Sequence, residues 1–188
     1  MEPANPPKKQ IDYFLIAIVI AALMLAFYLF LKPASAPWAK PQPAASLAPG
    51  TMVQPITVTS LSGTREIVDY KKYDKPTVIY VISPSCVWCK RNTQNINALA
   101  SRKAEAFHFV GVSLSEPGLA EYLNSHGLDF PTYQQLAPES RQMLGLGATP
   151  QTIVISRDGR VLKNWIGAFN SELQPEIEEF FGIQLPGL

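Results

Sequence analysis

Charge is scarce in this sequence of 188 residues. Charged residues make up 16% of it, the formal net charge is +1, and no run of lysine or arginine stands out. Because nucleic-acid-binding domains gather positive charge on one face, this balance argues against nucleic acid as a partner. No internal repeat is apparent either.

Cysteine and histidine are equally scarce, with two of each. Cys86 and Cys89 form one C-x-x-C pair, and the sequence contains no second such pair and no H-x-x-x-H. A zinc site completed by His108 and His126 is therefore disfavoured, because the two histidines fall in different predicted elements. An inert structural disulfide is also disfavoured, since a bridge closing so short a loop restricts the unfolded chain very little. We expect no metal and no cofactor at this pair.

The cysteine pair lies between a predicted strand and a predicted helix. Residues 77–82 form an apolar run of strand length, and residues 90–103 lack proline and glycine and place apolar side chains at helical spacing. Cys86 is therefore expected at a helix N-terminus, where unpaired N–H groups and the helix dipole favour the thiolate. Cys89 follows one turn later and should lie deeper. An exposed attacking thiol and a shielded resolving thiol are what thiol–disulfide exchange needs.

The longest apolar run lies near the N-terminus. Residues 13–31 are nineteen uncharged, mostly apolar residues, and as a helix they would span roughly 28 Å, close to the hydrocarbon thickness of a bilayer. A cleaved signal peptide is the alternative, because Ala34-Ser35-Ala36 resembles a cleavage site. Against cleavage, the run exceeds the usual apolar core of a signal peptide, and Pro37 would follow the cut. We predict a transmembrane anchor over residues 11–31.

The anchor divides the chain into four predicted parts. Two lysines, Lys8 and Lys9, precede the apolar run closely and two, Lys32 and Lys40, follow it. The count of positive charges is therefore a tie, and the close N-terminal pair favours a cytoplasmic N-terminus only slightly. Disulfides persist outside the cytoplasm, which favours a cytoplasmic tail over residues 1–10 and a periplasmic C-terminal domain. Residues 32–52 are rich in proline and alanine and predict an extended linker. Residues 53–188 predict one folded domain of a single-pass cell-membrane protein.

The domain sequence predicts an α/β fold with an N-terminal β-hairpin. The expected strands are residues 56–59, 65–68, 77–82, 107–112, 152–155 and 161–166, the last two joined by a turn at Asp158-Gly159. The expected helices are residues 90–103, a segment from a Ser115 cap to Gly127, residues 139–144, and a segment from a Ser171 cap to Gly182.

A C-x-x-C after one strand and Thr149-Pro150 ahead of another resemble the thioredoxin superfamily. The resemblance covers nearly all of residues 53–182. The hairpins and the anchor resemble the membrane-anchored TlpA/ResA-like branch, with its redoxin or AhpC/TSA-like domain, and the S-P-S-C-x-x-C-K segment is also similar to methylamine-utilisation thioredoxin-like proteins. The resemblance implies a central mixed sheet flanked by helices and a cis peptide bond before Pro150. It also implies that Thr149 offers backbone hydrogen bonds to a bound peptide.

Several positions depart from the common pattern of the superfamily. Val87 and Trp88 replace the proline-containing dipeptide between the cysteines, and Trp88 either guides substrate or covers the sulfurs. The strand position six residues before the first cysteine, often Asp or Asn in relatives, is Tyr80 here. No buried carboxylate is therefore evident to take a proton from Cys89, and the direction of electron flow stays open.

The favoured hypothesis is a membrane-anchored, extracytoplasmic thiol–disulfide oxidoreductase that acts on protein thiols or disulfides. Cys86 would attack and Cys89 would resolve the mixed disulfide. The resemblance favours a reductase, implies an electron-transfer partner in the membrane, and admits a role in cytochrome c maturation. Two alternatives stay open. A thiol peroxidase usually has Thr where this chain has Ser83, and copper or other metal chaperones usually space their cysteines by three residues.

Overall fold

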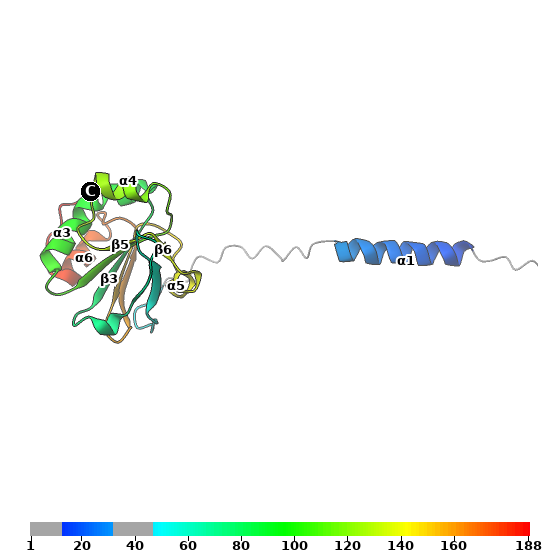
Figure 1. Cartoon of the computed structure of the whole chain (residues 1–188), viewed down its shortest axis with the longest axis horizontal. Helices are drawn as coiled ribbons and strands as arrows, with labels where there is room; N and C mark the ends of the chain where they lie inside the picture. Colours follow the sequence, from blue (N-terminus) through cyan, green and yellow to red (C-terminus); the bar gives the residue numbers. More distant parts are fainter. Residues whose placement is uncertain (1–12, 32–46) are drawn as a thin grey trace, which may run out of the picture. The chain divides into compact units, whose positions relative to one another are not determined.

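A computed structural model describes residues 13–31 and 47–188 (Figure 1). The predicted cytoplasmic tail and most of the predicted linker lie outside these residues. The chain divides into two compact units, residues 1–42 and 43–188. In the first unit, helix α1 (Tyr13–Leu31) has 19 residues, and its side chains are exposed from Leu15 to Tyr28. Across residues 13–31 and 47–188, no helix is long and apolar enough to cross a membrane.

A mixed five-stranded sheet forms the centre of the second unit. Its strand order is β5-β4-β3-β7-β8, in which β3 pairs parallel with β4 and antiparallel with β7. The strands are β3 (Thr77–Ile82), β4 (His108–Ser113), β5 (Thr132–Tyr133), β7 (Gln151–Ile155) and β8 (Val161–Ile166). β3 is buried along its whole length, as its unbroken apolar sequence predicts for a central strand covered on both faces. The predicted α/β fold with a central mixed sheet is confirmed.

A second, smaller sheet contains the predicted N-terminal hairpin. Strand β1 (Ile56–Thr59) lies between β2 (Arg65–Val68) and β6 (Gln135–Leu136), and both pairings are antiparallel. Strands β5 and β6 were not predicted from the sequence. Each has two residues, too few to produce a recognisable alternation of apolar and polar side chains.

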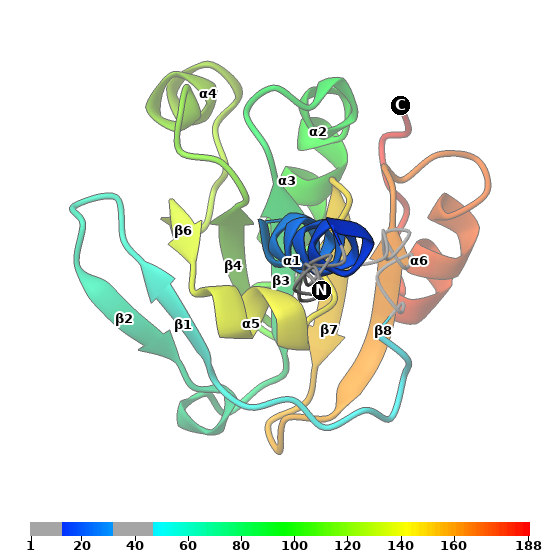
Figure 2. The ribbon, with the colours of Figure 1, turned by 90° about the vertical axis from the view of Figure 1, so that its right-hand side faces the viewer.

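Helices cover one face of the central sheet, and the hairpin with a short helix covers the other (Figure 2). The helices are α2 (Val87–Arg91), α3 (Thr93–Lys103), α4 (Leu119–His126), α5 (Pro138–Met143) and α6 (Gln174–Phe181), with a 3₁₀ turn at Tyr70–Lys72. Successive residues of β3 face opposite sides of the sheet. Tyr80 accordingly packs with side chains of α3, α4 and α6, whereas Ile79 and Val81 pack with the hairpin.

The starts of three helices differ from the prediction, and α5 lies one residue earlier than the predicted residues 139–144. The helix predicted from residue 90 begins at Val87 and is divided at Asn92 into α2 and α3. Ser115 is not a cap, because α4 begins only after Gly118, whose φ of 79° takes the chain out of helical geometry. Ser171 is not a cap either. The side chain of Asn170 instead accepts hydrogen bonds from the N–H groups of Glu172 and Leu173, at 3.1 and 3.0 Å, in the turn before α6.

Both helix ends predicted at glycine are confirmed. Gly127 and Gly182 follow the last residues of α4 and α6 with positive φ, and each donates its N–H back into the helix. The turn at Asp158-Gly159 is also present between β7 and β8. Residues 47–52, which the sequence places at the end of the linker, pack on this hairpin. Leu47 is buried, and the Gly50 N–H donates to the Val161 carbonyl at 2.8 Å.

Candidate active site

Cys86 lies in the connection between strand β3 and helix α2. After β3, a turn closes with the Cys86 N–H donating to the Ser83 carbonyl at 3.0 Å. Cys86 is the N-cap of α2, and its sulfur accepts a hydrogen bond from the Cys89 N–H at 3.1 Å. The predicted position at a helix N-terminus is confirmed. An anionic sulfur at this position interacts favourably with the N–H group and with the helix N-terminus.

The two cysteines differ in exposure, as predicted. Both are free thiols, but Cys86 is half-buried whereas the Cys89 side chain is completely buried. Burial, and secondarily the hydrogen-bonded contact with Cys86, raises the pKa of the Cys89 thiol to about 12. Cys86 is therefore the thiol that a partner sulfur can reach, while Cys89 stays protonated beneath it.

The loop before β7 brings Thr149 and Pro150 to the cysteines. The Thr149–Pro150 peptide bond is cis, which confirms the expectation from the resemblance. The Cys86 thiol donates a hydrogen bond to the Thr149 carbonyl at 3.3 Å, across 63 positions of sequence. Three residues singled out from the sequence thus meet at one point.

Trp88 lies on the outer face of α2. Its side chain is 51% exposed, and the Arg91 guanidinium lies 5.0 Å from the centre of the ring. Its neighbour Val87 is also exposed. This apolar surface beside Cys86 is available to a docking protein, which fits the substrate-guiding interpretation of Trp88.

A buried polar network beneath the cysteines was missed by the sequence analysis. The Asn92 amide donates to the Tyr80 hydroxyl at 3.2 Å, and its carbonyl oxygen accepts from the Phe169 N–H at 3.0 Å and from the Asn95 amide at 3.2 Å. Asn95 in turn accepts from the Gly187 N–H at 2.9 Å. No signal in the sequence could have found this network, because the asparagines resemble ordinary polar residues of a helix surface.

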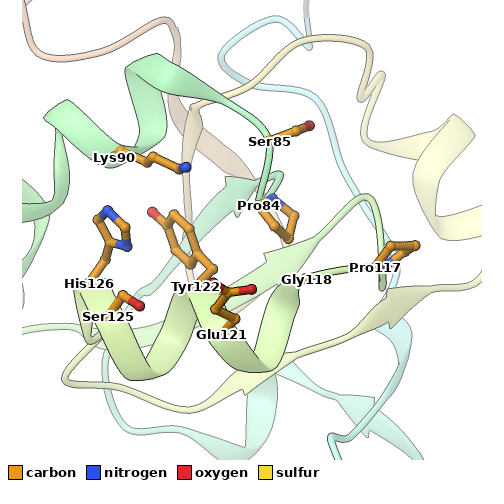
Figure 3. Close-up of a pocket in the computed structure, with 9 residues that line it drawn as sticks. All are labelled: Pro84, Ser85, Lys90, Pro117, Gly118, Glu121, Tyr122, Ser125 and His126. Atoms are coloured by element: carbon orange, nitrogen blue, oxygen red, sulfur yellow. The ribbon is translucent and has the colours of Figure 1, made fainter.

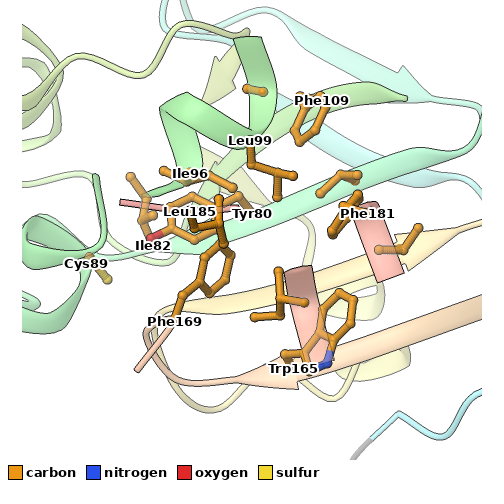
Figure 4. Packing of buried hydrophobic residues seen from close by; sticks show 14 of the residues in the cluster. Tyr80, Ile82, Cys89, Ile96, Leu99, Phe109, Trp165, Phe169, Phe181 and Leu185 are labelled. Carbon is orange, nitrogen blue, oxygen red and sulfur yellow. The ribbon is translucent and has the colours of Figure 1, made fainter. Parts of the chain in front are cut away.

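Tyr80 occupies the strand position below the cysteines as a neutral group. It is fully buried, and burial raises its pKa well above the usual value. Figure 4 shows Tyr80, Phe169 and Cys89 within the same packed cluster, and Trp165 lies in it as well. The ring packs in the core, as an apolar residue would, while its hydroxyl belongs to the Asn92 network.

The histidines do not form a metal centre with the cysteines. His108 stacks on Tyr73 with ring centres 3.6 Å apart, and His126 stacks on Tyr122 at 4.9 Å. In the portions of the chain that the structure describes, no three Cys, His, Asp or Glu side chains are grouped so that they could hold a metal ion. The zinc-site alternative gains no support from this arrangement.

The fold has close counterparts among solved structures. A candidate thiol:disulfide interchange protein DsbE from Chlorobium tepidum superposes with a TM-score of 0.62 and 16% identity, over 73% of this chain and 98% of that one. The thioredoxin domain of a thiol-disulfide oxidoreductase from Bacteroides vulgatus gives 0.59 and 19% identity, over 72% and 99%. At these identities the likeness establishes the thioredoxin-like fold.

Sequence comparison adds a relative and a family. A thioredoxin-like protein from Haemophilus influenzae is 25% identical over 108 residues, which are 56% of this chain and 63% of that protein. The chain thus matches less than two thirds of the length of this relative. The Redoxin family matches residues 48–180, a segment that contains Cys86, Cys89 and Pro150. Because this match spans well over half of the chain and includes the whole cysteine site, the chain belongs to the redoxin family.

Proposed function

We propose that this protein is a thiol–disulfide oxidoreductase that exchanges disulfides with protein substrates through Cys86 and Cys89. The observation that carries the proposal is the arrangement of the two sulfurs. A half-exposed thiol at a helix N-terminus receives a backbone N–H, and a fully buried thiol lies one turn behind it. The names of the superposed proteins, an interchange protein and an oxidoreductase, support the same chemistry.

The exchange proceeds in two balanced steps. The Cys86 thiolate attacks one sulfur of the substrate disulfide, so that a Cys86–substrate bond forms, the substrate S–S bond breaks, and the other substrate sulfur leaves as a thiolate and takes a proton. Cys89 then loses its proton and attacks Cys86, which releases the second substrate thiol. The substrate gains two electrons, and the protein loses them in forming the Cys86–Cys89 disulfide. The reverse sequence oxidises a dithiol substrate.

The surroundings of Cys86 suit a peptide substrate. The Thr149 carbonyl lies within hydrogen-bonding distance of the attacking sulfur, so an extended substrate backbone beside this loop would lie close to the reacting atoms. Trp88 contributes an exposed aromatic surface on the other flank. We assign Thr149 and Pro150 to substrate backbone recognition and Trp88 to substrate contact.

The test is to trap the intermediate. With Cys89 replaced by serine, the mixed disulfide cannot be resolved, and covalent adducts to cellular proteins should accumulate on non-reducing gels. The matched control is Cys86→Ser, which keeps one thiol but should trap nothing because the attacking sulfur is gone. The order of attack is wrong if Cys86→Ser traps partners and Cys89→Ser does not. Thiol-exchange chemistry itself fails if neither variant traps any partner and the wild-type pair does not equilibrate with glutathione.

We further propose that residues 11–31 anchor the protein in the cell membrane with the folded domain in the periplasm. The support is the nineteen-residue uncharged run, together with the persistence of disulfides outside the cytoplasm. The proline-rich residues 32–46 would hold the domain away from the bilayer. Alkaline carbonate should leave the protein in the membrane fraction, and protease added to spheroplasts should digest the domain. Carbonate release, or digestion only after the inner membrane is lysed, contradicts this placement.

The direction of transfer is set by the reduction potential of the cysteine pair. We propose net reduction, supplied by an electron-transfer partner in the membrane. A potential near that of thioredoxin, about −270 mV, would support a reductase, whereas one near that of DsbA, about −120 mV, would make the protein an oxidant. Consumption of hydrogen peroxide by the reduced protein, faster than exchange with peptide disulfides, would favour a thiol peroxidase instead.

A further inference from the structure

A polar pocket opens next to the two residues that precede Cys86, on the side where α2 faces α4 (Figure 3). It has a volume of about 280 Å³. Pro84 and Ser85, the two residues before Cys86, form one wall, and Lys90 reaches it from α2. The opposite wall consists of α4 and the turn that precedes it. Since a water molecule occupies about 30 Å³ in the liquid, the pocket has room for a polar side chain and several waters.

Two residues that line this pocket each have a buried polar atom without a hydrogen-bond partner. The Tyr122 side chain is 97% buried, yet its hydroxyl has no hydrogen-bond partner in the described parts of the chain. Thr93 lies nearby, but its hydroxyl donates to the Cys89 carbonyl at 3.2 Å, and no hydrogen bond of normal geometry joins it to Tyr122. The buried Nδ1 of His126 is also unpartnered. Buried polar groups are normally satisfied, so a group that enters this pocket could complete the hydrogen bonding of these two atoms.

The two residues pack against each other, and a positive charge lies with them. The rings of Tyr122 and His126 stack with an interplanar angle of 11°. Figure 3 shows the Lys90 ammonium and the Tyr122 hydroxyl pointing to the same end of the pocket, while the Glu121 carboxylate points to the other end. Within residues 13–31 and 47–188 the two ion pairs are Arg160–Asp158 and Lys163–Glu176. Among these residues, the exposed Lys90 ammonium forms no ion pair.

A carboxylate is the group that best fits the Tyr122 hydroxyl and the Lys90 ammonium. It accepts several hydrogen bonds at once, it would neutralise the ammonium, and charge-assisted hydrogen bonds are stronger than neutral ones. A neutral amide would leave the positive charge unmatched.

We propose that this pocket, which is lined by the two residues before Cys86, binds an acidic side chain of the protein substrate, with Lys90 and Tyr122 as the residues that select it. The inference rests on the proposed thiol–disulfide exchange and names a class of substrate for it. Ser85 lines the pocket and is joined directly to Cys86. Consecutive residues of an extended chain advance by about 3.5 Å, so a residue one or two positions from the target cysteine is within reach. Preferred substrates carry Asp or Glu there.

The experiment measures preference rather than rate alone. In a set of peptide disulfides, a single Glu is placed in turn at each position from two residues before to two residues after the target cysteine. Each peptide is matched by one with Gln at the same position. The full-length reduced protein is mixed with each peptide at low ionic strength, and the second-order rate constant of reduction is recorded. For at least one position, we expect the Glu peptide to react about tenfold faster than the matching Gln peptide.

The ratio of Glu to Gln rates separates binding from thiol reactivity. Lys90→Gln also removes a charge near Cys86, but that change affects both peptides equally and cancels in the ratio. Lys90→Gln and Tyr122→Phe should each bring the ratio close to one, and Lys90→Arg should restore part of it. The control is Lys72→Gln, which removes an exposed lysine of the 3₁₀ turn outside the pocket and should keep the wild-type ratio. Thermal unfolding of each variant verifies that it is folded.

Failure of this inference is distinguishable from failure of the proposed function. If the wild-type protein reduces Glu and Gln peptides at equal rates at every position, the acidic subsite is refuted and the exchange activity stands. A Glu preference that survives both Lys90→Gln and Tyr122→Phe also refutes it, because the selecting residues would lie elsewhere. If no peptide is reduced at all, the proposed function fails, and the subsite fails with it.

Discussion

Replacing Asn92 with alanine should destabilise the folded domain more than any surface change of the same size. Asn92 separates α2 from α3, three residues after Cys89, and is fully buried. Its side chain joins β3, α3 and the loop after β8 through hydrogen bonds to Tyr80, Asn95 and Phe169. Alanine retains the helical backbone but removes every one of these bonds.

The expected loss follows from the groups left behind. The Phe169 N–H and the Asn95 amide each lose an acceptor in a buried site, and an unsatisfied buried polar group costs about 1–3 kcal/mol. The Tyr80 hydroxyl loses a neutral hydrogen bond, which contributes about 1 kcal/mol. Allowing for partial relaxation, the unfolding free energy should fall by about 3–5 kcal/mol. This is a large fraction of the roughly 5–15 kcal/mol that stabilises an ordinary domain.

Urea unfolding of the full-length protein, followed by tryptophan fluorescence, measures this loss. Trp165 is 3% exposed in the packed core and will report its exposure to water. The control is Asn124→Ala, which removes an exposed amide on α4 and should shift the unfolding free energy by less than about 0.5 kcal/mol. A loss below about 1 kcal/mol for Asn92→Ala, with an unchanged denaturant slope, would refute the reasoning, since the buried network would then contribute no more than a surface amide.

Two further predictions concern the resolving step and the late hairpin. The rate at which Cys89 resolves a mixed disulfide on Cys86 should rise roughly tenfold per pH unit from about pH 6 to 9, because burial raises the pKa of its thiol to about 12 and its thiolate fraction grows in that proportion. Stopped-flow measurement of substrate release tests this, and a plateau below pH 9 contradicts it. Gly159→Ala should destabilise the domain by at least about 1 kcal/mol more than Gly63→Ala, because both glycines have positive φ but only at Gly159 would a Cβ lie 2.6 Å from a carbonyl oxygen, that of Val53. Equal melting temperatures of the two variants would show that the hairpin moves to admit the methyl group.

The core of the active site was predictable because it is local in sequence. An apolar run of strand length, a C-x-x-C pair and a following stretch without proline or glycine place Cys86 at the start of a helix, and the structure has it there. The greater burial of Cys89 follows from the same helical geometry. The cis bond before Pro150 came from the family resemblance rather than from any local pattern, and it is present.

The helix starts that were predicted wrongly show where local sequence patterns do not suffice. Ser115 and Ser171 are both good capping residues, yet α4 begins after Gly118, and Asn170 accepts the hydrogen bonds of the turn that leads into α6. Several residues near a helix start can accept its free N–H groups, and the direction in which the chain arrives from the sheet decides which one does.

The sequence by itself determined the order of the main strands, the cysteine pair at its strand–helix junction and the long apolar segment near the N-terminus, because periodicity and spacing act over neighbouring residues. Only the tertiary structure decided which groups surround the sulfurs. The Thr149 carbonyl reaches Cys86 across 63 positions, and Asn92 is buried because the loop carrying Phe169 closes over it. The Tyr122 hydroxyl, which has no hydrogen-bond partner in the described chain, belongs to a residue that lines the same pocket as Ser85 because α4 packs beside α2. Burial and the convergence of distant groups depend on which surfaces pack together, and packing is a property of the whole fold.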